Sequence, residues 1–170
     1  MQEYTEKEIE LFLQLYEESM SDDQTQSLKK LISVQDKIAS FKDIDHQELK
    51  AVVYDLKFVR FSYKDYVIKE GDESSEIFYI IDGECQVFID KHKVGKLKAG
   101  DVFGEVAAIF HTPRNASVVC AAPTATMLSF SIDHDNMEFC ASALAQLYKN
   151  LAFEINSKLE SLNKEFSKKR

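Results

Sequence analysis

The hydrophobic pattern changes its period part-way along this chain, and that change limits the possible folds more than any other feature. From Lys57 to Asp133 short apolar runs alternate with polar residues and are separated by turn residues. Alternation of this kind is typical of half-buried strands, whereas the segments on either side show the spacing of three and four that is typical of helices. Many short strands at turn spacing indicate a sandwich or jelly roll. We therefore expect a mainly β fold, a jelly-roll-like barrel with N-terminal helices and a long C-terminal helix.

Three helices are predicted before the β region. The first two are expected over residues 5–20 and 22–39, where each follows a capping pattern and has an apolar stripe. The third begins after Asp45, which is followed three residues later by Glu48, and we expect its apolar face to continue through Leu56. These helices would pack on the barrel or on a second subunit.

A turn is predicted at Asp82-Gly83, in the middle of the segment "EIFYIIDGECQVFID". Asp-Gly between two strand-like runs favours a type I′ turn, because both central residues of that turn need positive φ. The sequence therefore predicts a hairpin at this point.

The last predicted helix runs from Met137 to about Lys168. Its apolar residues recur at intervals of three and four: Leu144, Tyr148, Leu151, Ile155, Leu159, Leu162 and Phe166. This spacing is close to a coiled-coil seam with one stutter. The apolar face is larger than a small barrel alone would cover, so we expect a homodimer formed through this helix.

Composition excludes several classes of protein. A net charge of −8 argues against nucleic acid as a partner, because binding a phosphate backbone needs a basic stripe. No apolar run approaches the roughly 20 residues that a membrane helix needs, and the acidic N-terminus is unlike a secretory signal. We therefore expect a cytoplasmic protein without a membrane or nucleic-acid partner.

Metal and disulfide sites are also disfavoured. The three cysteines, Cys85, Cys120 and Cys140, form no Cys-x-x-Cys pair and lie in apolar patterns, which favours buried hydrophobic roles. A metal-dependent barrel enzyme would need clustered histidines, whereas the barrel segment offers only His92 and His111. We expect no metal and no enzymatic activity.

The stretch "FGEVAAIFHTPRNASV", residues 103–118, has the features of an anion site. Gly104 allows a ligand to approach the backbone, and residues 105–110 are expected to form a short helix whose first N–H groups suit an anion. Pro113 fixes the backbone before Arg114, whose guanidinium offers paired donors to a phosphate. Glu105 would suit a hydroxyl of the same ligand, as in a sugar phosphate. The alternative is an ordinary turn, with Arg114 paired to a nearby surface acid.

The longer pattern, "FGEVAA" followed by "IFHT" and "PRNASV", resembles the phosphate-binding cassette of cyclic nucleotide-binding domains. This is the family of the protein kinase A regulatory subunits and the catabolite activator protein. The resemblance covers about residues 41–162. It implies cAMP or cGMP as ligand, with Glu105 accepting from the ribose 2′-hydroxyl and Arg114 pairing with the cyclic phosphate. The implied ligand-binding residues are Phe103, Gly104, Glu105, Val106, Ala107, Arg114, Asn115 and Ala116.

Three residues depart from the family pattern. Ala108 replaces a larger aliphatic residue, His111 replaces a common glycine, and Asn115 is neither of the types that accompany cAMP or cGMP preference. Base preference therefore stays open. The resemblance also suggests that Leu162 and Asn163, in the last helix, contact the base.

The resemblance implies a regulatory function. We expect a stand-alone cyclic nucleotide-binding domain that signals through its C-terminal helix to a dimer mate or a separate effector protein. The alternative is a degenerate scaffold that dimerises or acts as an adaptor without binding nucleotide. The expected division is an N-terminal helical extension over 1–40, the β-roll with its first helix over 41–136, and a lid or dimerisation helix over 137–170.

Overall fold

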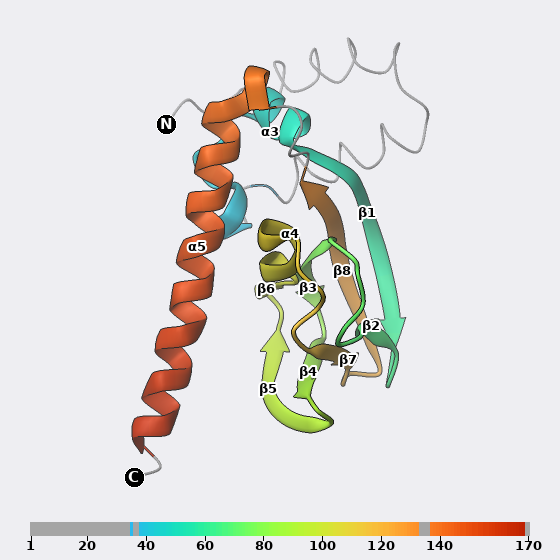
Figure 1. Cartoon of the computed structure of the whole chain (residues 1–170). Coiled ribbons are helices and arrows are strands. Elements are labelled where there is room, and N and C mark those ends of the chain that lie inside the picture. Colours follow the sequence, from blue (N-terminus) through green and yellow to red (C-terminus); the bar gives the residue numbers. More distant parts are fainter. Residues whose placement is uncertain (1–34, 36–37, 133–136, 169–170) are drawn as a thin grey trace.

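Two antiparallel sheets form the body of the molecule in a computed structural model, which describes Gln35, residues 38–132 and residues 137–168 (Figure 1). The strand order is β1-β8-β3-β6 in one sheet and β2-β7-β4-β5 in the other. In chain order the elements are η1 (Ala39–Phe41), α3 (His46–Val52), β1 (Val53–Ser62), β2 (Tyr66–Ile68), β3 (Ile77–Asp82), β4 (Glu84–Ile89), β5 (His92–Lys98), β6 (Val102–Phe103), α4 (Glu105–Phe110), β7 (Ser117–Cys120), β8 (Thr124–Ile132) and α5 (Met137–Lys168). The predicted mainly β fold with a long C-terminal helix is confirmed.

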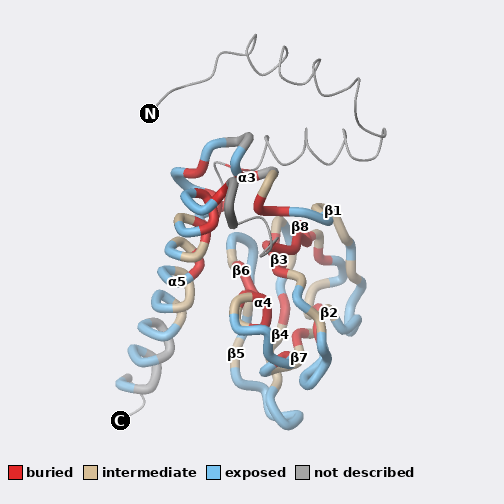
Figure 2. Tube along the Cα trace, turned by 45° about the horizontal axis from the view of Figure 1, so that its top comes forward, coloured by how far each residue is buried: buried red, intermediate tan, exposed pale blue. Residues whose placement is uncertain are grey.

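The core has two parts that share strand β3. Phe78 and Ile80 face the interior of the roll, whereas Ile77 and Tyr79 pack against the helices. Successive residues of a strand point to opposite faces, so a strand that is covered on both sides needs a continuous apolar run. The run "IFYII" at the start of β3 meets that need: the first four residues of the strand are buried, and its end is more exposed (Figure 2).

The Asp82-Gly83 hairpin prediction is wrong. Strands β3 and β4 follow one another in the chain but belong to different sheets, so this pair is a corner between the two layers. Gly83 has a φ of +97°, and a Cβ placed on it would lie 2.8 Å from the Cα of Ala125. A glycine is therefore required both by the backbone and by close contact with β8. Local turn chemistry predicted where the chain bends, but Asp82 lacks the positive φ of a type I′ turn, and the predicted pairing of the two strands was also wrong.

The third helix is shorter than its apolar pattern indicated. Asp45 does cap it, since the Glu48 backbone N–H donates to Asp45 Oδ1 at 3.4 Å. However, α3 ends at Val52, and Leu56 lies in β1, which begins at Val53 and pairs with β8. The ladder with β8 supplies backbone hydrogen bonds that compete with helix extension. The helices expected over 5–20 and 22–39 lie outside the described residues, apart from positions 35, 38 and 39.

Helix α5 has the predicted bounds and runs along one side of the roll (Figure 1). Its first half is packed on this chain, where Leu144, Leu147 and Leu151 are buried against η1 and α3. The Asn150 side-chain amide fixes this contact by donating to the carbonyl oxygens of Ser40 at 3.0 Å and Lys42 at 2.7 Å. Part of the predicted dimer seam is therefore used within the chain.

The remaining expectations about the chain have different outcomes. All three cysteines are buried free thiols, as predicted. The structure tests no boundary of the predicted division into 1–40, 41–136 and 137–170, although η1 spans the first of them. In the described part of the chain, none of the helices has the length and apolarity to cross a membrane.

Candidate functional site

The short helix α4 spans Glu105–Phe110, as predicted, and lies between the roll and α5 (Figure 1). Gly104 precedes it with a φ of +86°, and His111 ends it with a φ of +51°. Both positions are left-handed, so the chain turns sharply at each end of the helix. We call residues 103–118 the cassette. A Cβ on Gly104 would lie 2.7 Å from the Glu76 carbonyl oxygen and 2.8 Å from Arg114 Nη1, so the backbone here has no room for a side chain.

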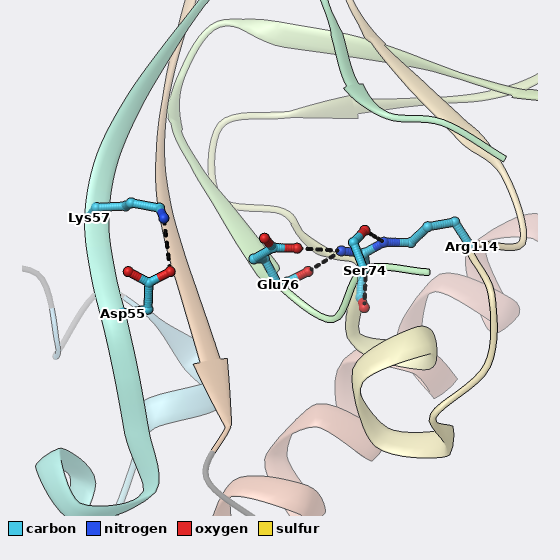
Figure 3. A network of polar contacts seen from close by, with 6 residues as sticks. Asp55, Lys57, Ser74, Glu76 and Arg114 are labelled. Atoms are coloured by element: carbon cyan, nitrogen blue, oxygen red, sulfur yellow. Dashed lines mark hydrogen bonds and ion pairs between the residues drawn. The ribbon is translucent and has the colours of Figure 1, made fainter. Parts of the chain in front are cut away.

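The Arg114 side chain points inward from the cassette loop, and all three of its guanidinium nitrogens donate hydrogen bonds. Its Nε donates to Ser74 Oγ at 2.8 Å, and Nη1 donates to the Gly104 carbonyl oxygen at 2.9 Å. Its Nη2 donates to the backbone carbonyl oxygen of Glu76 at 2.8 Å and to the Glu76 carboxylate at 3.3 Å (Figure 3). The guanidinium therefore ties the far end of the cassette to its beginning and to the loop before β3.

Burial is the main electrostatic influence on this guanidinium. The Arg114 side chain is 2% exposed, and burial lowers its pKa because removal from water disfavours the charged form. The carboxylates of Glu76, Asp72 and Glu105 act in the opposite direction. Since arginine starts from a very high pKa, the side chain remains a cation at neutral pH. The sequence also allowed an arginine that simply pairs with a surface acid. This is partly the case, because Arg114 pairs with Glu76, whose side chain is 38% exposed.

Glu105 is a buried carboxylate at the first position of α4. Its side chain is 6% exposed, and Oε1 accepts from Lys158 Nζ of α5 at 2.6 Å. A buried carboxylate costs free energy unless it is paired, so this lysine stabilises it. The two ends of the proposed ligand site thus each have a partner from the protein itself: Arg114 has Glu76 and Glu105 has Lys158.

Glu154, on α5, is a second acidic residue close to Glu105 and Lys158. Burial raises the pKa of Glu154 to about 7, and the nearby Glu105 and Asp101 carboxylates act in the same direction. Lys158 and a hydrogen bond with the Ser40 backbone act in the opposite direction. The cluster of Asp101, Glu105, Glu154 and Lys158 therefore contains more acidic groups than basic ones.

The geometry of the cassette agrees with a family comparison. Residues 58–139 match the family model of the cyclic nucleotide-binding domain. This match covers just under half of the chain. Curated proteins that are similar to the chain include regulatory subunits of cAMP-dependent protein kinase and cGMP-dependent protein kinases. A cAMP-dependent protein kinase regulatory subunit from Debaryomyces hansenii is 34% identical over 85 residues, which cover 49% of this chain and 19% of that protein. The cGMP-dependent protein kinase 2 of Mus musculus is 29% identical over 126 residues, which cover 73% and 16%.

Solved structures show the same fold at low sequence identity. A cyclic nucleotide-binding domain from Methylobacillus flagellatus KT has a TM-score of 0.66 at 18% identity, covering 85% of each chain. The catabolite activator protein of Thermus thermophilus has a TM-score of 0.56 at 17% identity, covering 76% of this chain and 62% of the other. The chain spans less than a fifth of the length of the two curated relatives named above.

The predicted site residues are buried to different extents. Most lie within the cassette and are buried or half-buried: Phe103, Gly104, Glu105, Val106, Ala107, Arg114 and Ala116. Asn115 is exposed in the loop after Arg114. Asn163 is exposed on α5, five residues beyond Lys158, and the Leu162 side chain lies outside the described residues. The structure thus brings the cassette residues together and leaves the two suggested base contacts as predictions.

Sequence reasoning missed four residues of the site: Ser74, Glu76, Glu154 and Lys158. The two residues of the first pair lie in the loop before β3, and those of the second lie on α5. Their contacts with the cassette join residues 38 to 53 positions apart in the chain, so no local spacing indicates them. Within the described residues, no cluster of three or more histidine, cysteine or acidic side chains is arranged to hold a metal ion.

Proposed function

We propose that this domain binds a cyclic nucleotide, cAMP or cGMP, at the cassette and transmits the binding event through α5. The main support for the proposal is that a buried cation, Arg114, and a buried carboxylate, Glu105, both lie next to Gly104. Arg114 bonds to the Gly104 carbonyl, and Glu105 is the next residue along the chain. A cyclic nucleotide has an anionic phosphate and a ribose hydroxyl close together, which suits one donor and one acceptor at this spacing.

The proposed roles follow from the chemistry of each group. Arg114 would pair with the exocyclic oxygens of the cyclic phosphate, supported by backbone N–H groups near Gly104, Ala107 and Ala116. Glu105 would accept from the ribose 2′-hydroxyl. Phe103, Val106 and Asn115 complete the proposed ligand-binding set, and Leu162 and Asn163 are the proposed base contacts. No metal is required, and we propose a regulatory rather than an enzymatic role.

Isothermal titration calorimetry with cAMP and with cGMP tests this function. We expect saturable heat with at least one nucleotide, and we expect Glu105→Gln to weaken binding about tenfold, because it removes a charge-assisted hydrogen bond. Glu73→Gln is a matched control, since Glu73 is exposed in the loop before β3. The control is expected to bind like the wild type. Because Glu105 also accepts from Lys158, the deciding comparison is made without that lysine: equal affinity of Lys158→Gln and the Lys158→Gln/Glu105→Gln double variant would refute the role of Glu105.

A second candidate function is a scaffold that has lost nucleotide binding. The observation in its favour is that Arg114 and Glu105 are both engaged by groups of the chain itself. Absence of heat with both nucleotides at high micromolar concentration would favour the scaffold. A cytoplasmic location and a separate effector protein also remain part of the proposal.

We also propose that α5 forms a homodimer. Beyond Leu151 the helix loses its cover, and Leu159 is 55% exposed. A second copy of α5 would remove this apolar surface from water. Light scattering is expected to give a dimer, and Leu159→Glu is expected to shift the distribution toward monomer. A wild-type monomer both with and without cyclic nucleotide would contradict this proposal.

A further inference from the structure

The ion pair between Lys158 and Glu105 adds a polar connection between α4 and α5, two helices that also contribute to the same hydrophobic core cluster. Glu105 belongs to the cassette, and Lys158 belongs to the second half of α5, after the leucines that pack on η1 and α3. Among the described residues, Lys158 is the last position of α5 with a polar contact to the roll. Lys158 therefore holds this half of the helix to the cassette through a polar contact.

The surrounding charges explain why Lys158 is held there. Glu105 is almost fully buried, and the carboxylates of Asp101 and Glu154 add further negative charge near it. The Lys158 side chain is 34% exposed, so it reaches the buried carboxylate from the solvent side. Moving Lys158 away would leave an excess of negative charge at the cassette.

The ligand and Lys158 need the same carboxylate. Lys158 occupies Glu105 Oε1, so a ribose hydroxyl that bonds to this same oxygen displaces the lysine. We propose that Lys158 is an autoinhibitory lock, which holds α5 over the empty cassette and is displaced from Glu105 when a cyclic nucleotide binds. This inference rests on the proposed function, and it adds a residue of this chain that opposes binding. It also explains how occupancy of the cassette is transmitted to α5, because breaking this contact lets the helix move from its resting position to the proposed base contacts.

Affinity measurements on Lys158→Gln test the lock. In the wild type, breaking the ion pair offsets part of the free energy of binding, whereas the variant has no ion pair to break. The variant is therefore expected to bind cAMP or cGMP about tenfold more tightly, which is a typical coupling between two sites. Lys164→Gln is the matched control, since it changes the net charge equally at an exposed position of the same helix. It is expected to bind like the wild type. Weaker binding by Lys158→Gln would identify Lys158 as a ligand contact, and unchanged binding would show no competition; either result overturns the lock.

A double-mutant cycle identifies the partner of the lysine. The lock acts through Glu105, so Lys158→Gln is expected to have no effect on affinity in a Glu105→Gln background. A tenfold gain that persists in that background would overturn the proposed competition for Glu105.

Hydrogen–deuterium exchange without ligand separates failure of the lock from failure of the proposed function. The amides of residues 152–160 are expected to exchange faster in Lys158→Gln and in Glu105→Gln than in the wild type or Lys164→Gln. If no nucleotide binds to any of these proteins, the proposed function and the displacement step both fail, and faster exchange then shows only that the ion pair holds α5 to the cassette. Unchanged exchange in both variants refutes the lock whether or not nucleotide binds.

Discussion

Arg114→Ala is expected to abolish cyclic nucleotide binding and to lower the free energy of unfolding by about 3 kcal/mol. The substitution removes four hydrogen bonds, with Ser74 Oγ, the carbonyl oxygens of Gly104 and Glu76, and the Glu76 carboxylate. Acceptors left without donors in a buried site are more costly than the bonds were favourable. The expected loss lies at the low end for buried ion pairs, because Glu76 is partly exposed and regains water.

Chemical denaturation and calorimetry measure the two effects separately. Arg60→Ala is the control for loss of a positive charge, since Arg60 is exposed on β1, and it is expected to leave stability and binding nearly unchanged. Arg114→Lys is expected to fall between Arg114→Ala and the wild type, because an ammonium keeps the charge but cannot reproduce the geometry of a guanidinium. Unfolding of Arg114→Ala at the wild-type denaturant concentration would contradict the structural role, and wild-type affinity would contradict the binding role.

Gly104→Ala is expected to lower the free energy of unfolding by about 3–4 kcal/mol. Part of this loss is the left-handed backbone at a φ of +86°, which costs an L-residue about 1–2 kcal/mol. The remainder is overpacking, typically about 1–3 kcal/mol. The new methyl group would lie 2.7 Å from the Glu76 carbonyl oxygen and 2.8 Å from Arg114 Nη1. Both atoms belong to the Arg114 network, so the substitution is also expected to weaken nucleotide binding.

Gly100→Ala provides the comparison that isolates the packing effect. Gly100 has a similar φ of +94°, but a Cβ placed on it has no neighbour within 4 Å among the described residues. It is therefore expected to show only the backbone cost of about 1–2 kcal/mol. Equal destabilisation by the two substitutions, measured by denaturant titration, would show that the close contacts at Gly104 do not matter.

The sequence predicted the cassette well because its geometry is determined locally. Gly104 supplies the turn before α4, and the small residues and Pro113 define where a short helix begins and must end. The limits of α5 were predictable for the same reason, since its apolar spacing continues over many turns. Family resemblance then supplied the expected roles of Glu105 and Arg114.

The failed predictions involve choices between distant partners. Asp82-Gly83 has the composition of a hairpin, but pairing of β3 with β6 and β8 places β4 in the other sheet. The predicted third helix loses its last turn to the ladder between β1 and β8. Lys158 is one of many lysines in the sequence, and only the packing of α5 on α3 and η1 brings it to Glu105. Local propensity carries no information about these tertiary contacts.

Strand β3, whose residues from Ile77 to Ile80 are all buried, also determines how firmly the two halves of the site are held. Glu76, which anchors Arg114, directly precedes the strand and shares its rigidity. Lys158, which anchors Glu105, extends from a part of α5 where most neighbours are exposed or half-buried. We therefore expect the phosphate side of the site to stay fixed and the ribose side to move. Such an asymmetry would let one nucleotide use its phosphate as the point of attachment and its sugar as the trigger.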